Sequence, residues 1–142
     1  MRGIARRLGV DPMAIYNHYD DRDAVLAAAG AFAFDALEVR AATGWRRRLE
    51  ALAEAYVDLI ARRGALLQHL IAHAEAAPAA IRAFDAKFAE AIGDMRVRPS
   101  AKEAVVDFLH GFAFGVPRTG LDARFRRLLA SELAVVIDGI RP

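Results

Sequence analysis

Apolar side chains recur at every third or fourth position along almost the whole chain of 142 residues. This spacing places them on one face of an α-helix, whereas a strand would require alternation of apolar and polar residues. No segment sustains that alternation, and the abundant alanine, leucine and arginine favour helices. The pattern therefore predicts an all-α fold without a sheet.

Two short helices separated by a glycine are expected at the start of the chain. The first covers about Arg2–Leu8 and ends at Gly9, because glycine accepts the left-handed conformation that ends helices. Its expected inward-facing residues are Ile4, Ala5 and Leu8. Asp11 can cap the second helix, and Pro12 suits its first position, where no N–H is needed. This helix should end near residues 18–19.

Longer helices follow, and residues that cap or break helices mark their expected boundaries. Asp20 or Asp21 caps a helix that runs to about Val39, and Thr43 caps the next helix, which Gly64 breaks. A shorter helix follows Gly64, and Pro78 and Gly93 bound the helix after it. Ser100 and Glu103 form the capping box of a helix that Pro117 and Gly120 end, and the last helix runs from about Asp122 to Ile137. A loop is expected at residues 96–99.

Apolar stripes along these longer helices define the expected core. They consist of Val25, Leu26, Ala29, Phe32 and Leu37; Leu49, Leu52, Tyr56, Leu59 and Ile60; Leu66, Leu67, Leu70 and Ile71; Ile81, Phe84, Phe88 and Ile92; Val105, Phe108, Leu109 and Phe112; and Phe125, Leu128, Leu129, Leu133 and Val136. A chain of this length can bury enough of its surface to fold without disulfides or a structural metal.

The composition excludes several classes of protein. The chain has no cysteine, which excludes disulfides and cysteine-ligated zinc. No apolar run approaches the about 20 residues that a membrane span needs, and the arginine-containing start does not resemble a signal peptide. The sequence also has no nucleophile elbow, phosphate-binding loop or carboxylate pair with catalytic spacing. We therefore expect a soluble cytoplasmic protein that is not an enzyme and uses no cofactor.

The distribution of charge permits a nucleic-acid partner without requiring one. The net charge is +2 and the pI is about 9.4. Arg2, Arg6 and Arg7 make the first turns basic, and further basic clusters occur at residues 46–48 and 124–127. The two later clusters are interpreted as solvated helix faces.

The start of the chain has the features of a helix-turn-helix, in which two short helices cross through a tight turn. Ala5 is small enough to let the helices approach, Gly9 makes the turn, and Val10 and Ile15 are apolar plugs between the helices. Asp11 would cap the second helix, whose N-terminal residues would contact base edges in the major groove. The alternative is an ordinary helical hairpin with a glycine turn.

Four side chains of this unit suit contacts with bases. Met13 and Ala14 can contact thymine methyl groups, and Asn17 can pair with adenine. Arg2 can reach a guanine or a phosphate.

Three further side chains suit phosphate contacts, which position a protein on DNA without specifying sequence. Tyr16 and His18 can donate to phosphate from the second helix, and Arg22 can do so from the start of the next one. Pro12 is expected to be exposed beside them.

This segment resembles the tetracycline-repressor family of transcriptional regulators. The matching positions are Ala5, Leu8, Gly9, Val10, Ile15, Tyr16, His18 and Leu26. The resemblance implies DNA contacts at Arg2, Pro12, Met13, Ala14, Tyr16, Asn17, His18 and Arg22. Arg22 replaces the family's usual lysine, and Tyr19 replaces a smaller residue or phenylalanine. The family's unit begins with one further helix, so residues 1–40 are expected to be an incomplete DNA-binding domain that includes a linker helix.

Residues 41–142 are expected to form a helical regulatory domain that binds a ligand and dimerises. The segment at residues 108–115, followed by Phe125 and an apolar last helix, resembles the end of the family's regulatory domain. The resemblance implies a homodimer through the last two helices. The candidate interface residues are Phe108, Gly111, Phe112, Gly115, Leu129, Leu133 and Val136. The alternative for these residues is the core of a single chain.

Aromatic and apolar walls with a few polar groups are typical of small-molecule sites. The candidate pocket residues are Tyr56, His69, His73, Phe84, Phe88, Phe108 and Phe112, each of which has a core position as its alternative. His69 and His73 have a spacing that some metal sites use, but no third ligand at suitable spacing is evident besides a possible approach by His110. We therefore expect no metal site.

These features together predict a ligand-responsive transcriptional regulator, a repressor that binds palindromic operator DNA as a homodimer. Two recognition helices about 34 Å apart would match successive major grooves of double-stranded DNA. A small-molecule effector would release the DNA by binding one arrangement of the helical domain better. The alternative is a truncated helical dimer that binds a small molecule or a protein partner without binding DNA. The sequence identifies neither the effector nor the operator.

Overall fold

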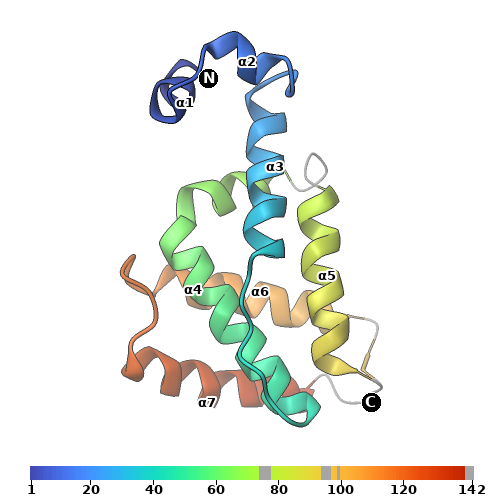
Figure 1. Ribbon diagram of the computed structural model, residues 1–142. Helices are drawn as coiled ribbons and strands as arrows, with labels where there is room; N and C mark the ends of the chain where they lie inside the picture. The colour runs from blue at the N-terminus through green and yellow to red at the C-terminus, as the bar shows by residue number, and fades with distance from the viewer. Residues whose placement is uncertain (74–77, 94–96, 99, 140–142) are drawn as a thin grey trace.

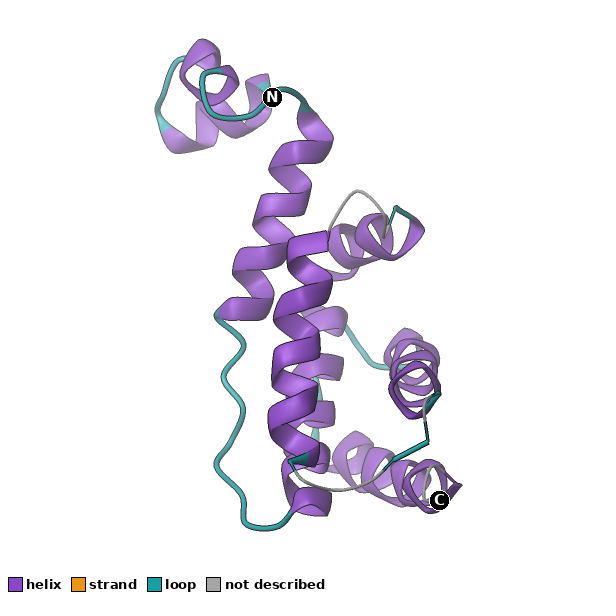
Figure 2. Cartoon of the chain, turned by 90° about the vertical axis from the view of Figure 1, so that its right-hand side faces the viewer, coloured by secondary structure: helices purple, strands orange, loops and turns teal. Residues whose placement is uncertain are grey.

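The computed structural model describes residues 1–73, 78–93, 97–98 and 100–139, except for the side chain of Ile71. The described part contains helices and no strand (Figure 2). The helices are α1 (Arg2–Leu8), α2 (Pro12–Tyr16), α3 (Arg22–Asp35), α4 (Trp45–Ala72), α5 (Pro78–Ile92), α6 (Ala101–Phe114) and α7 (Ala123–Gly139). The predicted all-α class is confirmed. Most of the loop expected at residues 96–99 lies outside the described residues.

Helix α4 is the centre of the arrangement. It packs against α3, α5, α6 and α7, and α3 also packs closely against α5. Helices α1 and α2 stand at one end of the molecule, with α7 at the other, and α3 leads from the first two into the body (Figure 1). We call α1, α2 and the turn between them, residues 2–16, the head.

The core lies where α4 meets its neighbours. Its fully buried side chains come from α4, α6 and α7. They are Leu49, Leu52, Val57, Leu67, Val105, Leu109, Leu129, Leu133 and Ile137. Phe34 of α3 belongs to the same core, so α3 shares its packing with residues 41–142.

Three predicted helix boundaries near the start of the chain are confirmed. Gly9 ends α1 in the left-handed conformation, with φ 68° and ψ 28°. The Asp11 carboxylate accepts a hydrogen bond of 2.7 Å from the Met13 amide at the start of α2. The Asp21 carboxylate accepts one of the same length, 2.7 Å, from the Ala24 amide at the start of α3. These boundaries depend on residues a few positions apart, which is why local sequence predicts them.

Two predicted caps are wrong. Gly44, and not Thr43, occupies the N-cap of α4, and its φ of 84° is one that a side chain would disfavour. Ser100 does occupy the N-cap of α6, but its side chain makes no capping hydrogen bond. The capping box with Glu103 is therefore not formed.

Two other expected boundaries differ from the structure. Helix α4 continues through Gly64 to Ala72, with non-helical angles only at Arg63 (φ −117°, ψ 23°). The expected break is thus a kink. Helix α3 ends at Asp35 rather than near Val39, and an irregular segment then leads to α4, which runs back along α3 (Figure 1).

Several residues expected to face inward are exposed. Leu8 and Val10 of the head are 65% and 43% exposed, because no described helix packs against that side of α1. Phe32 is 74% exposed, whereas Phe34 is buried, so α3 turns a different face to the core from the one expected. Ile81 and Leu128 are also largely exposed, and Ala29 is exposed.

Ion pairs join α4 to α7 on the surface of the packed core. Arg46 pairs with Asp138 at 2.6 Å, and Arg126 pairs with Glu54 at 2.8 Å. These arginines come from the two clusters interpreted as solvated faces; both link two helices, while Arg47, Arg124 and Arg127 of the same clusters are exposed. In the described part of the chain, no helix has an apolar stretch long enough to cross a bilayer.

Candidate functional site

The head is held together by a small contact between two helices. Ala5 of α1 is only 1% exposed, and Ile15 of α2 is 8% exposed. The missing β-carbon at Gly9 permits the left-handed turn, and the Val10 amide donates to the Ala5 carbonyl at 3.1 Å. The result is a hairpin of two short helices with a glycine turn, which agrees with the helix-turn-helix interpretation and with its alternative alike.

The side chains predicted to contact DNA lie on α2 and on the segments that flank it. Met13 and Tyr16 are 63% and 45% exposed, although both are large and partly apolar. The other predicted residues are also exposed, apart from partly buried Pro12; they are Arg2, Ala14, Asn17, His18 and Arg22. The structure thus leaves these side chains accessible around one short helix.

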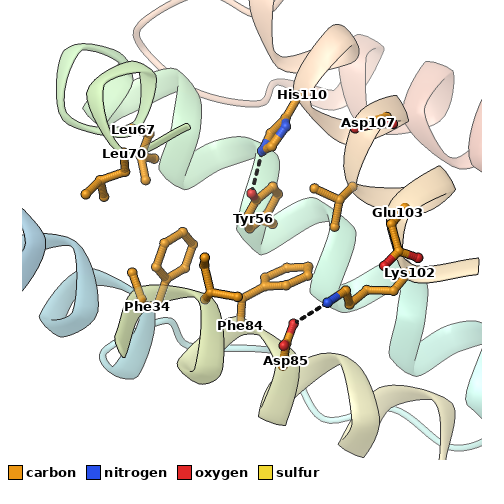
Figure 3. A pocket seen from close by; sticks show the side chains of 13 residues that line it. Phe34, Tyr56, Leu67, Leu70, Phe84, Asp85, Lys102, Glu103, Asp107 and His110 are labelled. Atoms are coloured by element: carbon orange, nitrogen blue, oxygen red, sulfur yellow. Dashed lines mark hydrogen bonds and ion pairs between the residues drawn. The ribbon is translucent and has the colours of Figure 1, made fainter. Parts of the chain in front are cut away.

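A cavity of about 340 Å³ lies between α3, α4, α5 and α6 (Figure 3). Its lining residues are Phe34, Tyr56, Leu67, Leu70, Ala80, Ile81, Phe84, Asp85, Lys102, Glu103, Val106, Asp107 and His110. The volume is within the range of small-molecule sites.

Three aromatic rings from three helices form one wall of the cavity. Phe34 of α3 stacks on Tyr56 of α4 with 5.7 Å between ring centroids, and Phe84 of α5 approaches Tyr56 at 4.7 Å. Phe34 and Phe84 meet edge to face at 6.3 Å. Each ring contacts the other two, so together they form a continuous, largely apolar surface.

Tyr56 and His110 form the polar pair inside the cavity. The Tyr56 hydroxyl and His110 Nε2 are 2.7 Å apart, which is hydrogen-bond distance (Figure 3). Burial lowers the pKa of His110, and the nearby charge of Asp107 opposes that shift without cancelling it. Burial also raises the pKa of Tyr56 well above its ordinary value. Both groups are therefore neutral near pH 7, and the interior of the cavity carries no charge.

Charged side chains surround the opening of the cavity. Lys102 Nζ lies 3.1 Å from an oxygen of Asp85, which links α6 to α5 (Figure 3). Glu103 and Asp107 lie one turn apart on α6, and both are exposed. Neither forms an ion pair with a described residue.

Of the predicted pocket residues, only Tyr56 and Phe84 line the cavity. Phe88 lies one turn further along α5 and belongs to the core. Phe108 and Phe112 contact each other at 6.0 Å on another face of α6. None of these three residues lines the cavity.

His69 and His73 also lie outside the cavity. Their rings stack at 4.5 Å near the end of α4. His69 Nε2 lies 3.3 Å from Asp23 Oδ1, so this histidine connects α4 to the beginning of α3. Among the described residues, no three His, Asp or Glu side chains gather in a way that could hold a metal ion.

The predicted dimer residues divide into two groups. Leu129 and Leu133 are 1% and 0% exposed in the single chain, so they belong to its core and offer no surface to a partner. The burial of these two residues agrees with the alternative interpretation, the core of a single chain. The others retain accessible surface on α6 and α7; they are Phe108, Gly111, Phe112, Gly115 and Val136.

Sequence reasoning missed most of the cavity lining. Leu67 and Leu70 were predicted to face inward, but nothing indicated that they face a cavity. His110 was considered only as a distant third metal ligand, although it faces Tyr56. The lining comes from four helices, so no local spacing reveals it.

Comparisons with protein-family models, with curated proteins and with solved structures found no match to this chain.

Proposed function

We propose that this protein is a ligand-responsive transcriptional regulator, a repressor that binds palindromic double-stranded DNA as a homodimer. The observation that carries the proposal is the position of α3. This helix bears the head at one end and contributes Phe34 to the cavity near the other. A molecule in the cavity therefore touches the helix that follows the head in the chain.

Features of the head support a role in DNA binding. Two short helices joined by a glycine turn are the elements that a helix-turn-helix requires. Exposed Met13 of the head suits thymine and Asn17 directly after it suits adenine, while Arg2 of the head and Arg22 of α3 suit phosphate. Met13 is 63% exposed, so it contributes little to the packing of the single chain, and contact with a base would explain an apolar side chain at this exposed position.

The contacts of α3 support a mechanism of release. Asp23 meets His69 near the head, Gly30 lies against Leu70, and Phe34 stacks on Tyr56. Two of these contacts involve cavity-lining side chains of α4. A ligand that displaces them would move α3, and with it the head. Release requires that the ligand bind the moved arrangement more tightly than the DNA-bound one.

The face of α6 and α7 that is not in the core supports dimerisation. Phe112 meets Phe125 edge to face at 6.5 Å, and α7 also exposes Leu128 and Val135, at 43% and 73%. A β-carbon at Gly111 would meet no atom of the single chain, so packing within the chain does not require glycine at this mid-helix position. Close approach of a second copy would require it. A dimer would present two heads to successive major grooves.

The test is selection of bound sequences from a random double-stranded DNA library, followed by fluorescence anisotropy on the enriched sequence. We expect an enriched palindrome whose affinity falls steeply with salt. Arg2→Ala should weaken binding and reduce the salt slope by about one. Arg127→Ala, which removes an exposed arginine of α7, is the matched control and should bind like the unchanged protein.

Two outcomes would overturn the proposal. One is that no sequence is enriched at any salt concentration, which would favour a helical dimer that binds small molecules without DNA. The other is that Arg2→Ala and Arg127→Ala weaken binding equally, because this would indicate general attraction to a basic protein.

A further inference from the structure

We propose that the cavity binds an amphipathic organic cation, with an apolar body inside and a protonated amine or quaternary ammonium group at the opening. The proposal names the chemical class of the effector, and in this respect it rests on the proposed function. It follows from the contrast between the inside of the cavity and its rim.

The inside of the cavity suits an uncharged, apolar body. Phe34, Tyr56 and Phe84 form an aromatic wall, and Leu67 and Leu70 add aliphatic surface. The polar atoms of Tyr56 face those of His110 and bond to them. A charged group placed there would lose its hydration without gaining an opposite charge.

The opening, in contrast, carries an excess of negative charge. Asp85, Glu103 and Asp107 are the acidic lining residues, and Lys102 is the one lysine or arginine among the described lining residues. Because Lys102 is paired with Asp85, these two charges largely cancel. Glu103 and Asp107 remain, and carboxylates one turn apart on a helix repel each other.

A ligand cation at the opening would relieve this repulsion. The carboxylates of Glu103 and Asp107 lie on the turns of α6 that line the opening, with His110 one turn further along (Figure 3). The electric field of Asp107 reaches His110, because its charge acts on the pKa of that ring. The apolar body of the same ligand would lie against the aromatic wall inside the cavity.

The same arrangement disfavours an anionic ligand. A carboxylate at the opening would meet two unpaired carboxylates, and it would have to compete with Asp85 for Lys102. A neutral ligand would gain the apolar contacts but would leave the repulsion between Glu103 and Asp107 unchanged. The order of affinity expected for one apolar body is therefore cation, neutral, anion.

Isothermal titration calorimetry on the full chain tests this order with three probes that share one body. The probes are phenylbutylamine, phenylbutanol and phenylpentanoate, which differ in the charge of the head group. At neutral pH we expect the amine to bind about tenfold more tightly than the alcohol, and the carboxylate to bind most weakly. Tightest binding of the alcohol or the carboxylate, or no binding of the amine, would overturn the proposal.

Substitutions at the opening test the cause of the preference. In a double variant with Glu103→Gln and Asp107→Asn, the amine should lose most of its advantage while the affinity of phenylbutanol stays the same. Unchanged alcohol binding also shows that the variant still folds. Glu132→Gln, which removes an exposed carboxylate of α7, is the control and should keep the preference. An amine preference that survives in the double variant would contradict the proposal.

The DNA assay separates this inference from the proposed function. If the chain binds selected DNA and only neutral or anionic compounds release it, the proposed function stands and the cationic ligand class is wrong. If the amine binds with the expected preference but no DNA sequence is selected, the ligand class stands and the proposed function fails.

Discussion

Gly30 of α3 lies directly against the side chain of Leu70 of α4, with no space between them for a β-carbon. This close approach brings α3 onto α4 at the level of the cavity, which Leu70 lines. Elsewhere in a helix, alanine is preferred to glycine by about 1 kcal/mol. At this position the steric overlap with Leu70 opposes that preference.

Gly30→Ala should therefore lower the free energy of unfolding by about 1 kcal/mol, since overpacking a buried site outweighs the gain in helix propensity. Gly64→Ala is the matched control, because Gly64 lies in α4 and a β-carbon there meets nothing. The control should be neutral or stabilising. Urea denaturation monitored by circular dichroism measures both variants, and equal stabilisation of the two would show that α3 and α4 approach less closely.

Asp58 attaches the start of α7 to α4. One of its carboxylate oxygens accepts a hydrogen bond of 2.9 Å from the Leu121 amide, and the other accepts one of 2.7 Å from Arg62. Burial alone would raise the pKa of Asp58, but these hydrogen bonds and the positive charges of Arg62 and Arg126 outweigh it and lower the pKa. The carboxylate is thus bound in its charged form.

Asp58→Ala should lower the free energy of unfolding by about 1–2 kcal/mol at pH 7, because it leaves the Leu121 amide without its acceptor. A carboxyl group with a lowered pKa in the folded state stabilises the protein above its unfolded pKa of about 3.9, and that contribution is lost as the pH falls. The difference from the unchanged protein should therefore shrink towards pH 3, as thermal melts over this pH range would measure. Glu132→Ala, without a comparable contact in the described chain, should have little effect at either pH.

His110 makes a second contribution to the pH dependence of stability. Its pKa in the folded protein is lowered by burial, so the unfolded chain binds the proton more readily. The contribution of His110 to the free energy of unfolding should therefore be fully present above its unfolded pKa of about 6.5, and it should be lost as the pH falls below that value. His110→Gln should flatten the dependence of the unfolding free energy between about pH 7.5 and pH 5.5.

Tyr56→Phe provides the control for this prediction. It removes the hydroxyl that faces His110 but leaves the histidine buried, so the dependence on pH should persist. If Tyr56→Phe flattens the dependence as strongly as His110→Gln, the hydrogen bond and not burial is the main cause of the shift.

The limits of sequence prediction are visible in α3. The boundary at Asp21 was predictable because capping depends on a side chain and an amide three residues apart. Phe32 and Phe34 are both aromatic and both lie in this helix, yet only Phe34 enters the core. The choice between them depends on the rotation of α3 against α4 and α5, which no local pattern contains.

The cavity and the α6–α7 face show the same limit. Tyr56 and Phe84 were identified as candidates from their residue type, but the contact of Tyr56 with His110 joins positions 54 apart in sequence. Leu129 and Leu133 follow the same apolar stripe as Val136, and only packing separates buried residues from partly exposed ones. Residue type identifies the apolar side chains, but tertiary packing decides whether each one meets a core, a cavity or solvent.

The last prediction concerns the exposed apolar face of α7. Val135 is 73% exposed and lies beside the partly buried Val136, which the proposed dimer would cover. Val135→Glu should shift the mass measured by sedimentation from dimer to monomer, because a charge buried in an interface without a partner costs several kcal/mol. It should leave the helical signal unchanged, since Val135 contributes little to the core of the single chain.

Leu8→Glu is the matched control for Val135→Glu, because Leu8 is similarly exposed, at 65%, but belongs to the head. The control should remain a dimer. A monomeric unchanged protein, or a dimer that withstands Val135→Glu, would exclude this face of α7 from the interface. Loss of the dimer in both variants would instead place the contact between copies at the head, which would conflict with a head that is free to bind DNA.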